Sequence, residues 1–220
     1  MPGKAREPVE ELASAFPALT GHAASAQQRR QFSRYLELLI AWNKALDLTA
    51  LATPEAIVRH LFQDALLFLP LLPRRRPIRI ADIGTGAGFP GLPLRIADDG
   101  ISLTLVEARR KRVSFLSTVK RELGLGDVEI LHGRAEAILS EQPALAGTFD
   151  VVVSRAMARP TELIGLAAPY LVPGGLLIAT GPPQGIQRKA LPPGQDAEWR
   201  EIPYPALGLK RTFLVSVRSG

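Results

Sequence analysis

A short apolar stretch that runs straight into a glycine-rich turn constrains the fold of this 220-residue chain more than any other feature. Residues 78–83 predict a buried strand that contains Asp82, and glycine then recurs at every second position from Gly84 to Gly88. Because glycine has no Cβ and adopts positive φ readily, such a turn lets the backbone come close to a ligand. A strand followed by this kind of loop is typical of α/β folds that bind a nucleoside-bearing cofactor.

Two kinds of cofactor fit this loop. Residues 86–91 match the dinucleotide-binding pattern Gly-x-Gly-x-x-Gly, and Glu107 lies near the spacing expected of an acid that binds a ribose hydroxyl. The glycines begin earlier, however, at Gly84 directly behind Asp82. The resulting Asp-x-Gly-x-Gly-x-Gly resembles motif I of the class I S-adenosylmethionine-dependent methyltransferases. The loop alone favours a methyltransferase and leaves a nicotinamide enzyme as the alternative.

Composition excludes several other classes of protein. With 46% hydrophobic and 22% charged residues, no apolar run that could span a membrane and no secretory signal, the chain is expected to be cytoplasmic. It has no cysteine and three scattered histidines, so disulfides and a metal site are not expected. The net charge of +6 suits a polyanionic partner, although an arginine-rich genome would explain it equally well.

Apolar periodicity predicts helices at the start of the chain. Residues 26–46 carry apolar side chains at three- and four-residue spacing, which indicates an amphipathic helix. Residues 54–69 predict a second helix, with Thr53 as N-cap and Pro54 in its first turn. We expect residues 1–73 to form an N-terminal helical cap on a Rossmann-like methyltransferase domain, residues 74–220, in one compact unit.

Strands and helices alternate after the cap, which predicts an α/β fold with a mostly parallel sheet and helices on both faces. Pro173-Gly174-Gly175 is expected to break the chain before the fifth strand, and residues 182–194 read as a loop or a short irregular helix. Strands are expected at residues 78–83, 102–107, 128–131, 149–154, 176–180 and 212–217, and helices at residues 92–97, 111–123, 135–139 and 160–170.

Ligands of an open parallel sheet bind beyond the carboxyl ends of its strands, so each strand end is a candidate site. Glu107 ends the second strand, where it can accept hydrogen bonds from both ribose hydroxyls, although an ordinary helix-capping acid would look the same. Beyond the third strand, Ala135 and Glu136 open a helix whose free N–H groups could meet an adenine edge. Glu136 alone is explained more simply as an acid favoured by the helix dipole.

Arg155 follows the fourth strand, where the methyl acceptor would lie. Methyltransferases that act on amino groups of DNA typically carry Asn/Asp-Pro-Pro-Tyr/Phe at this point, and those that make methylcytosine use a cysteine. Neither pattern is present. The position therefore argues against an exocyclic amine or a pyrimidine carbon as acceptor.

Five segments together resemble the glucose-inhibited division protein B family, the bacterial small-subunit ribosomal RNA guanine-N7 methyltransferases. The resemblance runs over residues 30–218, and its most specific part is the extended loop with Phe-Pro-Gly-Leu-Pro. It implies S-adenosylmethionine as donor, a guanine N7 in 16S rRNA of the 30S ribosomal subunit as acceptor, and a cytoplasmic location. We expect a monomer without a metal and without a membrane partner. The segments are residues 42–49, 59–60, 82–94, 111–116 and 154–156.

Three positions depart from the family pattern. The family usually has Asn-Leu-Thr where residues 47–49 read Asp-Leu-Thr, and its His-x-x-Asp-Ser spacing is stretched here to His60-x-x-x-Asp64. Its Lys-Gly after the fifth strand appears as Thr180-Gly181. The resemblance therefore fixes no role for Asp64 or for Thr180.

The chemistry of guanine N7 suggests how the site would work. N7 has an exposed lone pair and no proton, so no general base is needed and catalysis can be mostly positioning, which contributes about 7–11 kcal/mol. The usual bidentate arginine grip on guanine takes O6 and N7 together and would block the nucleophile. We therefore expect Arg155 to contact O6 or a flanking phosphate. Phe89 is expected to stack near the target base or to line the methyl channel, with a packed turn residue as a nearly equal alternative.

The candidate residues fall into two sets, and two rival functions stay open. The rivals are an NAD-dependent oxidoreductase and a non-catalytic ribosome-binding module of the same fold. Arg211 matches a basic position in the family's closing strand, although a solvated strand end explains it as well. The cofactor set is Asp82, Gly84, Gly86, Gly88, Phe89, Glu107, Ala135 and Glu136, and the RNA set is Lys44, Arg134, Arg155 and Arg211.

Overall fold

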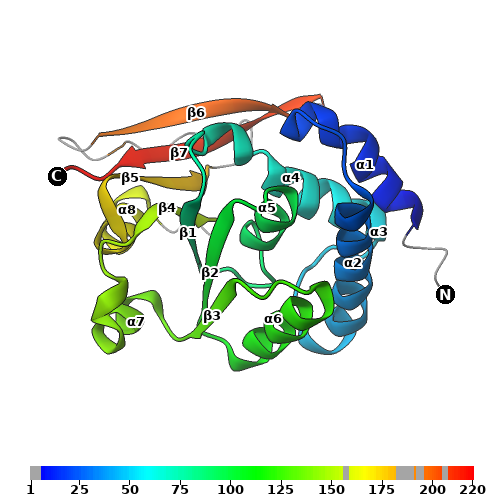
Figure 1. Cartoon of the computed structure of the whole chain (residues 1–220), viewed down its shortest axis with the longest axis horizontal. Coiled ribbons are helices and arrows are strands. Elements are labelled where there is room, and N and C mark those ends of the chain that lie inside the picture. The colour runs from blue at the N-terminus through cyan, green and yellow to red at the C-terminus, as the bar shows by residue number, and fades with distance from the viewer. Residues whose placement is uncertain (1–5, 156–158, 182–190, 192–195, 205–207) are drawn as a thin grey trace.

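A single seven-stranded sheet runs through the computed structural model, in the order β3-β2-β1-β4-β5-β7-β6 (Figure 1). The structure describes residues 6–155, 159–181, 191, 196–204 and 208–220. The strands are β1 (Ile78–Ile83), β2 (Ile101–Glu107), β3 (Val128–His132), β4 (Phe149–Ser154), β5 (Leu171–Thr180), β6 (Ala197–Tyr204) and β7 (Leu209–Val217).

Helices cover both faces of this sheet. No described helix is long and apolar enough to cross a membrane. The α-helices are α1 (Arg6–Thr20), α2 (Ala26–Leu46), α3 (Pro54–Ile57), α4 (Asp64–Leu66), α5 (Gly91–Ala97), α6 (Arg110–Leu123), α7 (Ala135–Glu141) and α8 (Pro160–Ala167). Shorter turns are the π-helical η1 (Val58–Gln63) and the 3₁₀-helical η2 (Leu69–Leu71), η3 (Pro143–Leu145) and η4 (Ala168–Tyr170).

The strand order places a binding site beside β1. Strands β1 to β5 are parallel, and β1 pairs with β2 on one side and with β4 on the other. The chain therefore changes its winding direction next to β1, which is where open α/β sheets bind their ligands. Strand β7 returns antiparallel to β5, and β6 closes the edge antiparallel to β7. The acid and the glycine loop that follow β1 thus lie at the switch point of the sheet.

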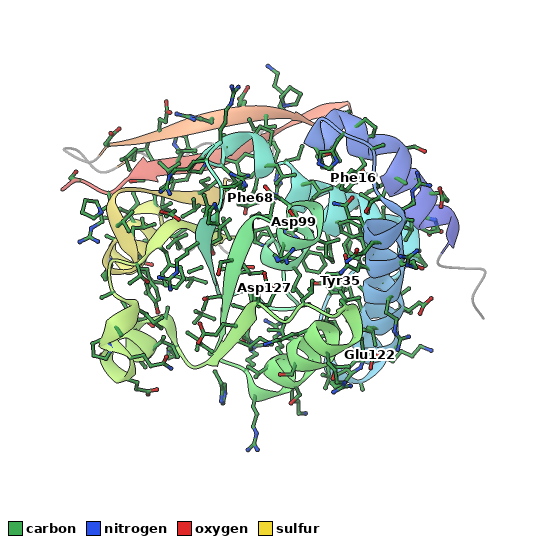
Figure 2. All side chains as sticks on the ribbon, in the orientation of Figure 1. Phe16, Tyr35, Phe68, Asp99, Glu122 and Asp127 are labelled. Carbon is green, nitrogen blue, oxygen red and sulfur yellow. The ribbon has the colours of Figure 1, made fainter. Side chains whose placement is uncertain are left out.

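Two hydrophobic layers hold the helices to the sheet. Side chains such as Ile80 point to one face of the sheet, which is covered by the cap helices together with α5 and α6. Their neighbours, such as Ala81, point to the other face, which is covered by α7 and α8. Figure 2 shows Phe16 and Tyr35 among the cap helices, and both side chains are fully buried in the first layer. Apolar side chains of the cap and of the sheet thus form one continuous core.

Most of the expected elements are confirmed, and the exceptions have physical causes. Helix α1 and strand β6 were not expected; α1 contains Pro17, and β6 is an edge strand rich in charged residues. Pro173-Gly174-Gly175 was expected to precede β5, but it lies within that strand. The pairing register with β4 shifts between Phe149 and Val151, whose partners are Leu171 and Leu176, so β5 contains additional residues at this point. The loop expected at residues 182–194 falls, apart from Leu191, outside the described residues.

The helix expected over residues 54–69 is divided by a π turn. Thr53 caps it as expected, because its side chain accepts a hydrogen bond from the amide of Ala56. The turn η1 then occupies residues 58–63 before α4 resumes the α-helical pattern. A π turn contains one more residue than an α turn over the same rise. The π turn therefore accommodates the one additional residue between His60 and Asp64.

We expect that Gln63 can be deleted with little loss of stability, because the π turn would close to an α turn. The Gln63 side chain is fully buried, and neither of its polar atoms has a hydrogen-bond partner in the described part of the chain. The melting temperature should change by less than about 3 °C, which is about 1 kcal/mol for a chain of this size. Deletion of the buried Leu66 is the control, because an α turn has no spare residue. Equal losses in the two deletions would contradict this prediction.

Candidate active site

The end of β1 places a buried carboxylate beneath the glycine loop. Asp82 is fully buried, and its Oδ2 accepts hydrogen bonds from the Thr85 hydroxyl at 2.7 Å and from the Gly91 amide at 2.8 Å. Its Oδ1 has no hydrogen-bond partner among the described residues. Burial raises the pKa of Asp82 to about 7, and the hydrogen bonds from Thr85 and Gly91 oppose this rise only in part. When ionised, a carboxylate with an unpartnered oxygen in such surroundings attracts a cation.

Gly86 and Gly88 have different structural roles in the loop. Gly88 is buried with φ +95°, and a Cβ there would lie 2.3 Å from Leu92 Cδ1 and 2.7 Å from Tyr35 Oη. Gly86 is partly exposed with φ +63°, and a Cβ there would meet nothing nearer than Arg112 Nη1 at 3.6 Å. Gly88 is therefore needed for packing of the loop, whereas Gly86 keeps an accessible surface of the loop free of side chains.

The cap contacts the loop directly. The hydroxyl of Tyr35, from α2, donates a hydrogen bond to the carbonyl oxygen of Ala87. The ring of Tyr35 also stacks on Phe89, with centroids 5.3 Å apart and planes 13° apart. Phe62 lies 5.6 Å from the ring of Phe89, whose side chain is only 6% exposed. These contacts suit a packed turn residue, and stacking of a target base on Phe89 stays a prediction.

Glu107 lies at the end of β2 and supports the same loop. The side chain is buried, with Oε2 accepting from the Gly86 amide and Oε1 from the Arg109 amide, each at 2.8 Å. Arg112 Nη1 lies 3.9 Å from Oε2. Each carboxylate oxygen has a second lone pair, so Glu107 can still accept hydrogen bonds from ribose hydroxyls. The helix-capping alternative and the ribose role are therefore compatible.

The hydrogen bonds of the loop amides argue against a dinucleotide. A pyrophosphate would need the free amides of the Gly-x-Gly-x-x-Gly segment. Here the amide of Gly86 donates to Glu107, that of Gly88 to the Thr85 carbonyl, and that of Gly91 to Asp82. Carboxylates thus occupy positions where a pyrophosphate would have to bind, and they would repel it. The site suits a donor with a positive charge, such as the sulfonium and ammonium groups of S-adenosylmethionine.

The tip of β3 provides the remaining candidates for cofactor binding. Ala135 is buried, and its carbonyl oxygen accepts a hydrogen bond from the Tyr170 hydroxyl at 2.6 Å. Arg134 and Glu136 flank it with exposed side chains. The first amides of α7 are those that a helix leaves without an internal partner. Contact of Ala135 and Glu136 with an adenine stays a prediction.

Arg155 lies at the end of β4 beside the loop. Its guanidinium carbon is 5.8 Å from the ring of Phe89, and its side chain is 22% exposed. Nη2 donates to the carbonyl oxygen of His60 at 3.0 Å and lies 3.2 Å from Asp64 Oδ2. The Thr180 hydroxyl donates to the carbonyl oxygen of Arg155 at 2.9 Å. The departures from the family pattern at residues 64 and 180 therefore both contact Arg155.

Arg211, expected to contact RNA, forms an ion pair with a buried carboxylate in this structure, and its contact with RNA stays a prediction. Its Nε lies 3.0 Å from Asp64 Oδ1, and the Arg211 side chain is 26% exposed. Buried Tyr204, on β6, is near enough for Asp64, Arg155 and Arg211 all to influence the pKa of its hydroxyl, which burial raises. Sequence reasoning named Asp64 without assigning it a role and did not name Tyr204. A lone acid in the apolar stretch of residues 61–72 was the available signal for Asp64.

Basic residues that can contact RNA phosphates lie at both ends of the strands, and of those described here Lys44 and Arg134 belong to the expected RNA set. Arg109 and Arg110 follow β2, and Arg134 follows β3, so all three lie exposed at the same sheet edge as the glycine loop. Lys44 is exposed in the last turn of α2. The Arg74-Arg75-Arg76 run precedes β1 and lies at the opposite edge, where Arg75 and Arg76 form ion pairs with carboxylates.

The fold and this site define a class I S-adenosylmethionine-dependent methyltransferase, and solved structures agree. A SAM-dependent methyltransferase from Aquifex aeolicus superposes with a TM-score of 0.54 at 15% identity, covering 74% of this chain and 93% of that one. A putative O-methyltransferase from Klebsiella pneumoniae gives a TM-score of 0.56 at 18% identity, covering 84% and 90%. Similarity at this level shows the fold and confirms the expected fold class.

Sequence comparison then identifies the family. The family model described as rRNA small subunit methyltransferase G, or GidB, matches residues 28–184. The Ribosomal RNA small subunit methyltransferase G of Streptococcus pyogenes serotype M12 is 40% identical over 160 residues, which are 72% of this chain and 67% of that protein. The chain belongs to the rRNA small subunit methyltransferase G family. It is a methyltransferase that uses S-adenosylmethionine, and the family resemblance read from its motifs is confirmed.

Proposed function

We propose that this chain transfers the methyl group of S-adenosylmethionine to N7 of a guanine in 16S rRNA of the small ribosomal subunit. Family membership supports an rRNA acceptor. The observation that favours N7 is the chemistry of the acceptor side, where Arg155 and Arg211 surround a carboxylate that they neutralise. Such a cluster can hold and orient a base. Its carboxylate is ion-paired with both arginines, and N7 is a nucleophile that needs no proton acceptor.

The residues of the chain divide the work of positioning between donor and acceptor. When bound, the donor supplies an electrophilic methyl carbon, which N7 attacks in one displacement as the bond to sulfur breaks and its electron pair stays on sulfur. Asp82 and Glu107 hold the cationic donor, and the guanidinium of Arg155 orients the guanine through O6. Methylation gives the purine a positive charge beside Arg155 and Arg211, which favours release of the product.

Recognition of the RNA would depend on shape and phosphate contacts. A-form RNA hides the major-groove edge that carries N7, so the target guanine must be unpaired or turned out of its stack. Exposed cations at the edge of the glycine loop can bind the flanking phosphates. We propose Lys44, Arg109, Arg110 and Arg134 for this role. A monomer acting on small subunits in the cytoplasm fits this mode of binding.

The test is to map the methyl group. Purified protein and S-adenosylmethionine are added to small subunits from a strain that lacks this activity. The 16S rRNA is then reduced with borohydride, which removes N7-methylguanine, and treated with aniline, which breaks the chain at the abasic site. A single new break is expected. Labelling without an aniline-sensitive site would place the methyl group on another atom, and absence of labelling would indicate a non-catalytic module. Naked 16S rRNA, tested in parallel, shows whether the assembled subunit is required.

Arg155→Ala and Arg155→Lys should both slow methyl transfer. A hydrogen bond to a charged group contributes about 1.5–3 kcal/mol, so kcat/KM for small subunits should fall about 30-fold in the alanine variant and less in the lysine variant. Affinity for S-adenosylhomocysteine, measured by calorimetry, should be unchanged because Arg155 lies on the acceptor side. Rates near those of the wild type for both variants would refute the assigned role of Arg155.

A further inference from the structure

A buried carboxylate joins three parts of the fold on the acceptor side. Asp64, at the start of α4 in the cap, is only 3% exposed. Its Oδ1 lies 3.0 Å from Nε of Arg211 on β7, and its Oδ2 lies 3.2 Å from Nη2 of Arg155 at the end of β4. Asp64 is therefore the one described carboxylate that forms ion pairs with both arginines.

These ion pairs are close but incompletely hydrogen-bonded. In the described part of the chain, Asp64 Oδ2, Arg211 Nε and the Tyr204 hydroxyl are buried without a hydrogen-bond partner. Buried polar atoms without partners destabilise the folded protein. A cluster that served stability alone would satisfy them better, so the arrangement is better explained by what it does to Arg155.

The contacts of Arg155 restrict how its guanidinium can bind a base. A guanidinium has two edges that offer a pair of donors, Nη1 with Nη2 and Nε with Nη2, and both include Nη2. In this structure Nη2 donates to the His60 carbonyl oxygen and faces Asp64 Oδ2. The His60 carbonyl oxygen takes one N–H of Nη2, and the Asp64 carboxylate lies against Nη2 without a hydrogen bond, so a guanine that used either two-donor edge would have to displace the first or bring its own acceptor atoms against the second. Among the described residues, Nη1 and Nε have no hydrogen bond or ion pair and can act as single donors.

We infer that Asp64 is a positioning residue that keeps Arg155 from gripping guanine at O6 and N7 together, so that N7 stays open to the methyl group. The inference rests on the proposed N7 chemistry. Arginine prefers the bidentate grip on guanine wherever both donors are free. Without the Asp64 charge, Arg155 would turn to that grip and form a complex that binds the RNA well but cannot react. Asp64 thus selects the reactive pose over the more strongly hydrogen-bonded one.

The π turn directs Asp64 to this position. Asp64 directly follows η1, which adds one residue after His60. The same turn presents the His60 carbonyl oxygen to Arg155. The stretched spacing between His60 and Asp64 is therefore compatible with both contacts to Nη2.

The test separates kcat from binding in Asp64→Asn, which keeps the shape of the side chain and removes its charge. We expect kcat for N7 methylation of small subunits to fall about tenfold, while affinity for the subunits stays the same or increases. A general loss of structure would instead weaken subunit binding and lower both the melting temperature and the affinity for S-adenosylhomocysteine. Should the asparagine variant not fold, Asp64→Glu keeps the charge but displaces the carboxylate, and the same split is expected.

A double variant makes the test specific to the bidentate grip. Lysine has no planar fork and cannot bind O6 and N7 together. In an Arg155→Lys background, Asp64→Asn should therefore cause no further loss of kcat. Equal loss in both backgrounds, or a folded Asp64→Asn protein with unchanged kcat, would overturn the inference. If the wild type itself does not methylate N7, the proposed function fails, and that result is seen in the aniline map before any variant is compared.

Discussion

Gly86→Val should lose binding of S-adenosylhomocysteine while the protein stays folded. A valine side chain at this position would cover the accessible surface of the loop, which is otherwise free of side chains. The dissociation constant, measured by calorimetry, should rise at least about 100-fold, which is about 2.7 kcal/mol. Because the nearest atom to a Cβ at Gly86 is Arg112 Nη1 at 3.6 Å, the unliganded loop has room for the first carbon of the side chain.

The control for Gly86→Val must reproduce the backbone strain without touching the site. Gly124 ends α6 with φ +67°, close to the φ of +63° at Gly86, and a Cβ there would meet nothing within 4 Å. Gly124→Val should destabilise the protein about as much as Gly86→Val and leave donor affinity intact. Wild-type affinity in the Gly86 variant would contradict the idea that this loop holds the donor.

Asp82 should make stability fall as the pH rises from 4 to 7. Burial raises the pKa of Asp82 from its ordinary 3.8 to about 7 in the folded protein. Below the pKa of Asp82 in the unfolded chain, both the folded and the unfolded state hold the proton, and the contribution of protonated Asp82 to the free energy of unfolding is fully present. Between the two values only the folded state holds it, so the free energy of unfolding falls by about 1.4 kcal/mol per pH unit, or about 4 kcal/mol in all. The loss is complete above the folded pKa.

Asp82→Asn isolates this effect, because its amide does not titrate and its oxygen can still accept from Thr85 and Gly91. The free energy of unfolding of the wild type minus that of the variant, followed by urea denaturation at several pH values, should decrease as the pH rises. A cationic donor prefers the ionised carboxylate, so wild-type affinity for S-adenosylmethionine should increase over the same range. A pH-independent difference in stability would show that Asp82 does not titrate as its burial implies.

Local sequence signals were sufficient for the donor side of the site. The apolar strand β1, the acid in it and the closely spaced glycines are contiguous in sequence, so Asp82 and the loop could be placed without knowledge of the fold. Helix α2 was equally accessible because its buried residues, such as Tyr35, recur with helical spacing. What the sequence could not give was the hydrogen bond from Tyr35 to Ala87, because it joins residues that are far apart along the chain.

The acceptor side depended on contacts between distant segments. Asp64, Arg155 and Arg211 come from the cap, β4 and β7, and no local pattern pairs them. The stretched spacing after His60 was visible, but without the π turn it looked like a reason to doubt Asp64. Strand β6, which carries Tyr204, was missed because its alternation breaks at Arg200-Glu201 and because it contains Pro203, a residue that argues against a strand interior.

The bond between the hydroxyl of Tyr35 and the carbonyl of Ala87 has a thermodynamic consequence for the whole N-terminal segment. If the glycine loop holds the donor as proposed, a fluctuation that detaches α2 also frees this loop, so the binding-competent population cannot exceed the population in which the cap is docked. Donor occupancy and cap docking must then reinforce each other by the same coupling free energy. The N-terminal cap therefore contributes to the affinity of the enzyme for its donor.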